Sequence, residues 1–209
     1  MRLFVLGASG GVGSCLLERA VGRGHNITAQ SRSATKLTGT DTIDVAIGPP
    51  ADAGFLRQHI AGHDAVVICL GIDRSGRTTL FSETMKAVVD VMKAAGVRRL
   101  VAVTGIGAGD SKGHGGWLYN HIIYPLFTRN RYADKDRQET IIEQSDLDWT
   151  IVRPAPFAAG ARVGPLQVHT EIPTGLQLRS ITRAEVVDFI LDSLECESFI
   201  RQKPFIGHS

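Results

Sequence analysis

The sequence has few cysteines and no long apolar run, and each absence excludes a class of protein. Its 209 residues include three cysteines, Cys15, Cys69 and Cys196, which lie far apart and form no Cys-x-x-Cys pair. Scattered cysteines of this kind indicate small buried side chains in a reducing compartment, not a disulfide framework. No apolar stretch approaches the roughly 20 residues that a membrane-spanning helix requires. We therefore expect no contact with a membrane.

The sequence also lacks a large excess of positive or negative charge. The 23 Lys and Arg residues against 21 Asp and Glu residues give a formal net charge of +2, and no basic run extends beyond Arg98 and Arg99. This balance provides no electrostatic basis for binding nucleic acid. Arg2 leads directly into an apolar segment, without the charged, apolar and small-residue succession of a secretory signal. We expect a cytoplasmic protein, and the sequence leaves its oligomeric state open.

The sequence also lacks a set of residues that could bind a metal. His59 and His63 have the i, i+4 spacing of two ligands on one helix face, but Gly62 indicates a helix end between them. No third ligand lies near in the sequence, whereas zinc sites need at least three protein ligands. We expect no bound metal.

What the sequence does contain begins at the N-terminus, where an apolar run meets a glycine motif. Arg2 to Leu6 reads as a strand, and Gly7-Ala8-Ser9-Gly10-Gly11-Val12-Gly13 follows before an amphipathic helical pattern. This order is typical of a dinucleotide-binding turn, in which the helix N-terminus carries roughly half a positive charge and faces a pyrophosphate. Gly7 permits the tight turn, Gly10 allows close approach of the phosphate, and Gly13 allows close helix packing. An ordinary strand–helix turn is the alternative.

The end of the second expected strand indicates which nucleotide binds. An NAD site usually places a carboxylate there for the ribose 2′-hydroxyl, but this sequence has Ser31-Arg32-Ser33. Arg32 offers a planar, permanently charged group suited to a 2′-phosphate. A solvated surface arginine is the alternative. The sequence therefore favours NADP over NAD.

Strand and helix patterns alternate along the chain. We expect further strands at 26–30, 41–45, 65–70, 100–104 and 149–153, and helices at 52–59, 79–95 and 129–144, with a last helix that starts at the capping box Thr182-x-x-Glu185. This alternation predicts one α/β domain over residues 1–209, with a doubly wound, mainly parallel sheet and a ligand cleft at the carboxyl ends of its strands. Two irregular segments over that edge, at about 105–130 and 156–180, are expected to form a substrate lid.

Several motifs together resemble a known family. They are the glycine motif, Arg32, Gly62-His63-Asp64-Ala65-Val66-Val67, Leu147-Asp148-Trp149-Thr150-Ile151-Val152-Arg153-Pro154 and Ser180-Ile181-Thr182-Arg183-Ala184-Glu185-Val186. The chain resembles an atypical short-chain dehydrogenase/reductase of the NAD(P)H-binding group that includes biliverdin IXβ and flavin reductases and nitrogen-metabolite-repression regulators. The resemblance implies a single Rossmann-like domain that binds NADP, with a substrate over the nicotinamide.

The resemblance also implies cofactor-binding positions, residue by residue. They are the pyrophosphate loop Gly7, Ser9, Gly10, Gly11, Val12 and Gly13; the 2′-phosphate site Arg32 and Ser33; the adenine-flanking pair Asp44 and Val45; the strand ends Leu70, Gly71 and Ile72 and Thr104, Gly105 and Ile106; and Pro154, Ala155 and Pro156 near the carboxamide. The family's glycine before the adenine-flanking pair is Ile43 here.

Candidate catalytic residues depart from the superfamily pattern. Many members use Tyr-x-x-x-Lys, whereas Tyr132-Ala133-Asp134-Lys135 is one residue shorter. A spacing of three still places both side chains on one helix face. We expect Lys135 to contact the cofactor and Tyr132 to donate a proton, with a charged surface helix as the alternative. His114, Tyr119, His121 and Tyr124 are further candidates, with a structural role as the alternative for each. His114, between glycines, is the best placed of them to face solvent and to exchange a proton near neutral pH.

Two function classes remain open. The first is an NADPH-dependent oxidoreductase that transfers hydride to a flat aromatic or conjugated small molecule such as a flavin, a quinone or a polyketide-type ring. Gly105 stands where related reductases have a serine, so such an acceptor would be protonated by another group or by solvent. The second class is a non-catalytic NADP(H)-binding redox sensor, which the missing Tyr-x-x-x-Lys and Gly105 favour.

Overall fold

Eight strands of the described chain form one sheet. We describe the protein from a computed structural model that covers residues 1–37, 39–72, 76–106, 129–159, 165–173 and 175–209. The strands are β1 (Arg2–Leu6), β2 (Asn26–Ser31), β3 (Ile43–Ile47), β4 (Ala65–Ile68), β5 (Arg99–Val103), β6 (Asp148–Pro154), β7 (Gln167–His169) and β8 (Phe205–Gly207). Their order in the sheet is β3-β2-β1-β4-β5-β6-β8-β7. Neighbours pair in parallel, except that β7 runs antiparallel to β8.

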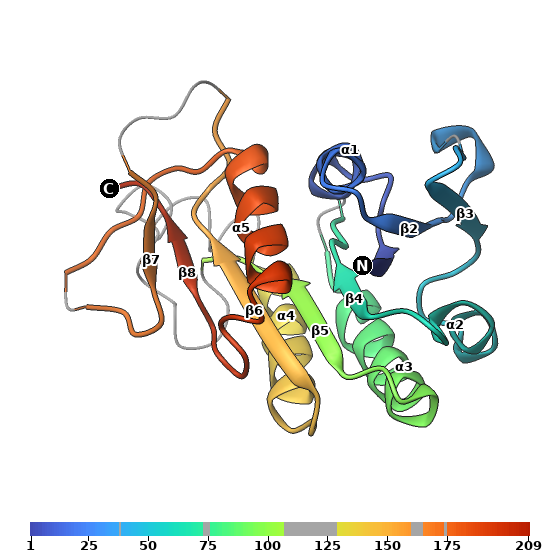
Figure 1. The fold of residues 1–209 in the computed structure, drawn as a ribbon. Coiled ribbons are helices and arrows are strands. Elements are labelled where there is room, and N and C mark those ends of the chain that lie inside the picture. The colour runs from blue at the N-terminus through green and yellow to red at the C-terminus, as the bar shows by residue number, and fades with distance from the viewer. Residues whose placement is uncertain (38, 73–75, 107–128, 160–164, 174) are drawn as a thin grey trace.

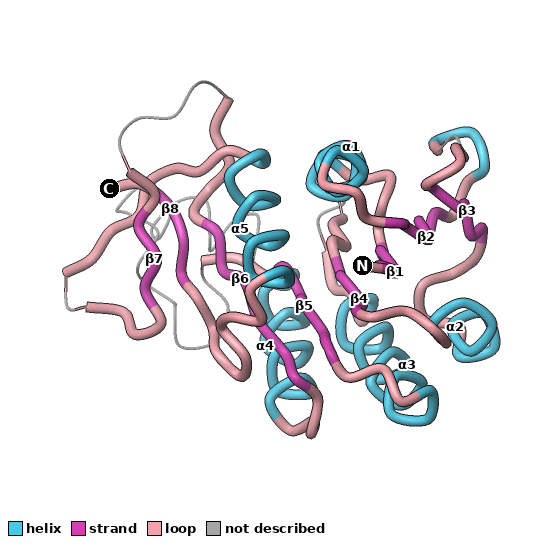
Figure 2. Tube along the Cα trace, viewed as in Figure 1, coloured by secondary structure: helices cyan, strands magenta, loops and turns pink. Residues whose placement is uncertain are grey.

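Helices cover both faces of the sheet (Figures 1 and 2). They are α1 (Gly11–Gly22), α2 (Ala53–Ile60), α3 (Leu80–Ala95), α4 (Arg129–Glu143) and α5 (Arg183–Glu195), with a short 3-10 helix, η1, at Ala34–Lys36. The side chains of β1 alternate between the two layers. Leu3 and Val5 pack into the core with α1 and α5, whereas Phe4 and Leu6 pack into the core with α2 and α3. This arrangement confirms the predicted α/β class with a doubly wound, mainly parallel sheet.

Most expected elements are present. The differences are the ends of predicted strands and two short strands that were not predicted. β3 continues to Ile47, two residues past its predicted end at Val45. β7 and β8 were not predicted, and β7 lies within the segment 156–180 that the sequence analysis treats as irregular. Each of these strands has three residues, which is too short for an alternating apolar pattern to be visible.

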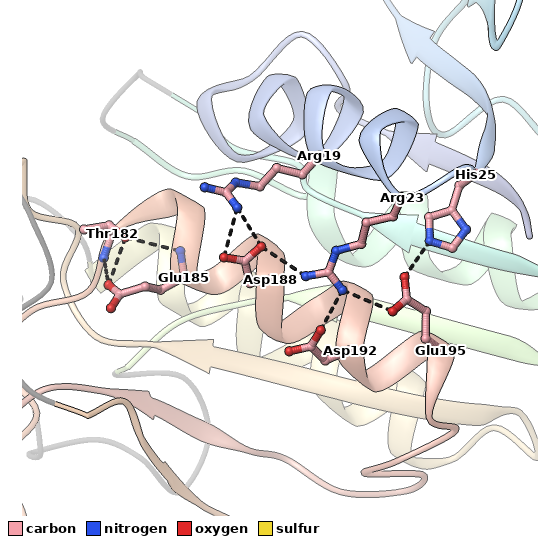
Figure 3. A network of polar contacts seen from close by, with 8 residues as sticks. All are labelled: Arg19, Arg23, His25, Thr182, Glu185, Asp188, Asp192 and Glu195. Atoms are coloured by element: carbon pink, nitrogen blue, oxygen red, sulfur yellow. Dashed lines mark hydrogen bonds and ion pairs between the residues drawn. The ribbon is translucent and has the colours of Figure 1, made fainter.

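Ion pairs join α1 to α5 (Figure 3). Arg19 contacts Asp188 at 2.8 Å, and Arg23 contacts Asp192 at 2.6 Å and Glu195 at 3.1 Å. The pairs advance along both helices in the same direction, so α1 and α5 run parallel. Individual surface pairs contribute little to stability, but this set fixes the register of the two helices. Their first turns therefore lie side by side at the carboxyl edge of the sheet.

In the part of the chain that the structure describes, none of the helices has both the length and the apolar character needed to cross a membrane.

Candidate active site

A cleft of about 700 Å³ opens at the carboxyl ends of the parallel strands. Sixteen residues expected at the cofactor line it: Gly7, Ser9, Gly10, Gly11, Val12, Arg32, Leu70, Gly71, Ile72, Thr104, Gly105, Ile106, Lys135, Pro154, Ala155 and Pro156. Other described lining residues are Gln30, Ser31, Lys36, Pro50, Cys69, Leu80, Phe81, Val103, Phe157 and Arg183. The strand ends of β1, β2, β4, β5 and β6 therefore meet in one site, as the predicted topology requires.

The glycine turn between β1 and α1 leaves no room for a side chain at Gly7 or Gly13. Gly7 has φ +76°, and a Cβ there would lie 2.9 Å from the Cys69 carbonyl oxygen. Gly13 does not line the cleft but packs behind it, where a Cβ would overlap the Gly7 carbonyl oxygen and lie 2.7 Å from Ala8 Cα. This contact holds the start of α1 against β1. The first-turn amide groups of α1, which have no acceptor within the helix, therefore face the cleft and can bind an anion.

Gln30 fastens this turn to the neighbouring strands. Its side-chain oxygen accepts a hydrogen bond from the Gly7 amide at 3.0 Å, and its side-chain nitrogen donates to the Gly48 carbonyl at 2.7 Å. Gln30 is buried, so both ends of its amide are satisfied within the protein. From the sequence, this residue was predicted only to lie in a strand. Its bonding role depends on contacts between β1, β2 and the end of β3, which no local pattern shows.

Basic side chains gather at the end of β2. Arg32 and Lys36 both line the cleft, are exposed and form no ion pair with a described residue. The Ser31 hydroxyl also lines it and donates to the Ser33 carbonyl at 3.0 Å. Ser33 is not among the lining residues, and its hydroxyl lies 2.9 Å from that of Thr35. Arg32 was predicted at the cleft from the sequence, whereas Lys36 was not, because Lys36 reaches the cleft through η1, a turn with no distinctive sequence signal.

Asp44 and Val45, which the family resemblance places beside the adenine, are not among the described lining residues of the cleft. They lie within β3 and border a separate hollow together with Arg2, His59 and His63. The reason is the extension of β3 to Ile47, which moves the strand end two residues further along the chain. Pro50, beyond that end, lines the cleft in their place.

The opposite end of the cleft is formed by α4. Lys135 is 7% exposed, and its Nζ donates to the carbonyl oxygens of Val103 at 3.3 Å and Thr104 at 2.8 Å. It also lies 4.8 Å from the centroid of the Phe81 ring. The ammonium group therefore stays inside the cleft at the end of β5, where the family resemblance expects the nicotinamide ribose.

A buried ion pair holds α4 in this position. Arg153 Nη2 on β6 lies 2.6 Å from Glu139 Oε2, and both side chains are nearly inaccessible, at 2% and 3% exposure. The Thr104 hydroxyl donates to Glu139 Oε1 at 2.6 Å. Removing one partner of such a buried pair would leave the other charge uncompensated. Because the Thr104 hydroxyl donates its proton to Glu139, it has no second proton to donate to a substrate in the cleft.

Asp134 connects α4 to the neighbouring helix α3. Its carboxylate is fully buried and accepts hydrogen bonds from the Phe81 amide at 2.9 Å and from the Ser82 hydroxyl at 2.5 Å. It therefore caps the first turn of α3 from a neighbouring helix. This contact brings Phe81 against the cleft beside Lys135. The sequence of α4 shows no apolar stripe. The reason is that the buried face of the helix carries polar side chains.

Of the three cysteines, Cys69 is the one among the described lining residues of the cleft. Burial raises the pKa of its thiol to about 12, and the charge of Lys135 only partly opposes this shift. The thiolate is the reactive form of cysteine. Cys69 therefore acts as a small apolar side chain near neutral pH and not as a nucleophile.

Two expected catalytic residues cannot be placed against the cleft. His114 and most of the expected lid segment 105–130 lie outside the described residues. Tyr132 belongs to α4, but its side chain is outside the described part as well. Both assignments stay predictions.

The tight turn yields a test with an internal control. Gly13→Ala should lower the free energy of unfolding by about 1–3 kcal/mol, because the new methyl group meets backbone atoms that cannot move aside. Gly22→Ala in the same helix has open space around the added carbon. It should leave stability unchanged or slightly higher. Urea unfolding of both variants measures the difference, and equal stability would contradict the packing described for Gly13.

Comparison with known proteins agrees with this geometry. A family model described as NAD(P)H-binding matches residues 7–197. The uncharacterized protein YwnB of Bacillus subtilis (strain 168) is 30% identical over 206 residues, which cover 93% of this chain and 92% of that protein. The family match includes the glycine turn, α4 and α5.

Solved structures share the fold. ChuY of Escherichia coli O157:H7, an anaerobillin reductase, superposes with a TM-score of 0.81 at 22% identity, covering 100% of this chain and 97% of that one. A short-chain dehydrogenase/reductase of Veillonella parvula DSM 2008 in complex with NADP has a TM-score of 0.81 at 17% identity, covering 99% and 94%. At these identities the likeness concerns the fold, whereas the family match concerns the sequence itself. The chain belongs to the NAD(P)H-binding family.

Proposed function

We propose that the protein is an NADPH-dependent oxidoreductase that transfers hydride to a flat aromatic or conjugated small molecule. The charge of the cleft carries this proposal. Four cationic side chains line it, Arg32, Lys36, Lys135 and Arg183, and its described lining includes no Asp or Glu. NADPH has four negative charges on three phosphate groups at neutral pH, to the nearest unit. A cleft of this composition favours such a ligand over an uncharged one.

The end of β2 supports the phosphorylated cofactor. A carboxylate at this point would favour NAD through the ribose 2′-hydroxyl and would repel a 2′-phosphate. Arg32 and Lys36 present two charges there instead, beside the Ser31 hydroxyl. The Veillonella parvula structure in complex with NADP is consistent with this choice for the fold.

The acceptor side supports a conjugated substrate. Gly105 has no side chain to donate a proton, the Thr104 hydroxyl is bonded to Glu139, and Lys135 Nζ is bonded to two main-chain carbonyls. Phe81, Phe157 and Ile106 contribute apolar surface to the same cleft. An acceptor that delocalises the charge of a transferred hydride depends least on a dedicated proton donor. The protein then mainly orients the two reactants.

A redox sensor that binds NADP(H) without turnover is the competing function, and the same scarcity of free donors favours it. Steady-state oxidation of NADPH with a panel of flavins, quinones and ketones separates the two. We expect acceptor-dependent oxidation with flavins or quinones and none above background with simple ketones. Tight NADPH binding without any acceptor-dependent oxidation would favour the sensor and contradict the enzyme.

Arg32→Ala tests the cofactor. The wild-type protein should bind NADPH more tightly than NADH, and the variant should lose most of this preference, because a charged hydrogen bond to a phosphate contributes about 1.5–3 kcal/mol. Binding is followed by the change in nicotinamide fluorescence. Equal affinity of the wild-type protein for the two nucleotides would contradict the proposed role of Arg32.

Lys135→Ala should raise the dissociation constant for NADPH by about one to two powers of ten, because it removes a cation held inside the cleft. Tyr132→Phe, on the same helix, is the matched variant. It should lower turnover while leaving cofactor affinity nearly unchanged, as expected for a contact made mainly in the transition state. Unchanged kinetics in both variants would show that α4 does not supply these groups.

A further inference from the structure

Arg183, the first residue of α5, lies across the mouth of the glycine turn. A Cβ added at Gly11 would come within 2.7 Å of Arg183 Nε and 3.3 Å of its guanidinium carbon. Arg183 lines the cleft and is exposed, and it forms no ion pair with any residue that the structure describes. Its charge is therefore available to a ligand at the first turn of α1.

The position of Arg183 follows from the pairing of α1 with α5. The ion pairs of Arg19 with Asp188 and of Arg23 with Asp192 set the two helices parallel and in register (Figure 3). The capping box of Thr182 and Glu185 fixes where α5 begins. These contacts place the start of α5 beside the first turn of α1, from which the Arg183 side chain reaches Gly11.

The nearest carboxylate on α5 does not neutralise this arginine. Glu185 accepts hydrogen bonds from the Thr182 amide at 3.0 Å and is 2.8 Å from His208 Nε2. Burial opposes ionisation of Glu185, but the bonds from Thr182 and His208 prevail and lower the pKa of its carboxyl group. Glu185 is thus committed to the capping box, on the side of α5 that faces the protein.

Phe157 holds the guanidinium over the turn. The Arg183 guanidinium carbon lies 5.3 Å from the centroid of the Phe157 ring, a distance typical of a cation–π contact. Phe157 is 43% exposed, and its backbone is fixed because the Ala158 amide donates to the Ile181 carbonyl at 3.0 Å. The ring therefore has a defined place from which it limits the movement of Arg183.

We propose that Arg183 binds the cofactor pyrophosphate from the side opposite the α1 amide groups, with Phe157 as its support. This inference rests on the proposed binding of NADPH and adds a residue to it from the far end of the chain. Arginine suits the role because its planar group donates several hydrogen bonds to phosphate oxygens and stacks on aromatic rings. The proposed role also explains why residue 11 is a glycine, since a side chain there would displace the guanidinium.

The position of the charge predicts a pattern across ligands. Arg183→Ala should weaken NADPH and NADH alike, by about 10-fold to 100-fold, because both contain the pyrophosphate. Adenosine 2′-monophosphate has the 2′-phosphate but no pyrophosphate, so its affinity should not change. Arg32→Ala should give the opposite pattern, with weaker binding of NADPH and adenosine 2′-monophosphate and unchanged binding of NADH. Dissociation constants are measured by calorimetric titration.

Further variants separate charge, stacking and surface effects. Arg183→Lys should recover part of the lost affinity, and Phe157→Leu should weaken both dinucleotides by about 2-fold to 10-fold through the lost cation–π contact. Arg179→Ala is the matched control, because Arg179 is an exposed arginine nearby that does not line the cleft. It should bind all three ligands as the wild type does.

Two results would overturn the inference. Wild-type affinity of Arg183→Ala for NADPH and NADH would exclude the pyrophosphate contact. Equal weakening of all three ligands would show that the substitution disturbs the cleft as a whole. The proposed function fails separately, if the wild-type protein binds neither dinucleotide, and the inference would then fall with it.

Discussion

The structure depends on how closely the backbone of α1 approaches β1. A carbon added at Gly13 in α1 would lie within 3 Å of main-chain atoms of Gly7 and Ala8, and a carbon added at Gly7 would lie 2.9 Å from the Cys69 carbonyl oxygen beyond β4. Only this proximity directs the first-turn amides of α1 into the cleft, where partial positive charge and unpaired donors are available to an anion. Gln30 then fixes the turn relative to β2 and β3 through both ends of its amide. The remaining parts of the site are arranged around this turn.

Charge outside the cleft is distributed differently from charge inside it. Arg19, Arg23 and Arg98 contact carboxylates on the surface, and Arg153 contacts Glu139 in the interior. Arg32, Lys36 and Arg183 line the cleft without a carboxylate partner among the described residues. Uncompensated cations that converge on one cleft repel each other in the free protein. A polyanionic ligand relieves this repulsion, which is why we connect the charge pattern to NADPH.

The sequence predicted the parts of the site that depend on local order. The glycine turn, Arg32 after β2 and the capping box of α5 each occupy a short stretch of chain with a distinctive pattern, and each lies where it was expected. The hydrogen bonds of Gln30 and the positions of Lys36 and Arg183 at the cleft were not predicted. They depend on which strands and helices become neighbours, and that information is not present in any single segment.

The buried polar face of α4 also depends on contacts with other segments of the chain, which the sequence of the helix alone does not show. Its buried Asp134 and Glu139 give the helix the appearance of a surface helix in the sequence, and only their partners on α3, β5 and β6 explain them. The predicted end of β3 was two residues too early. Asp44 and Val45 border a different hollow from the described cleft, and the adenine contact that the family resemblance implies for them stays a prediction. The roles of Tyr132 and His114 remain predictions.

A crystal structure of the protein with NADP tests the central claim most directly. We predict the pyrophosphate at the first-turn amides of α1, the 2′-phosphate between Arg32 and Lys36, and the nicotinamide toward Lys135 and Ala155. A cofactor bound in the reverse direction, or a 2′-phosphate with no contact to either basic side chain, would contradict the account.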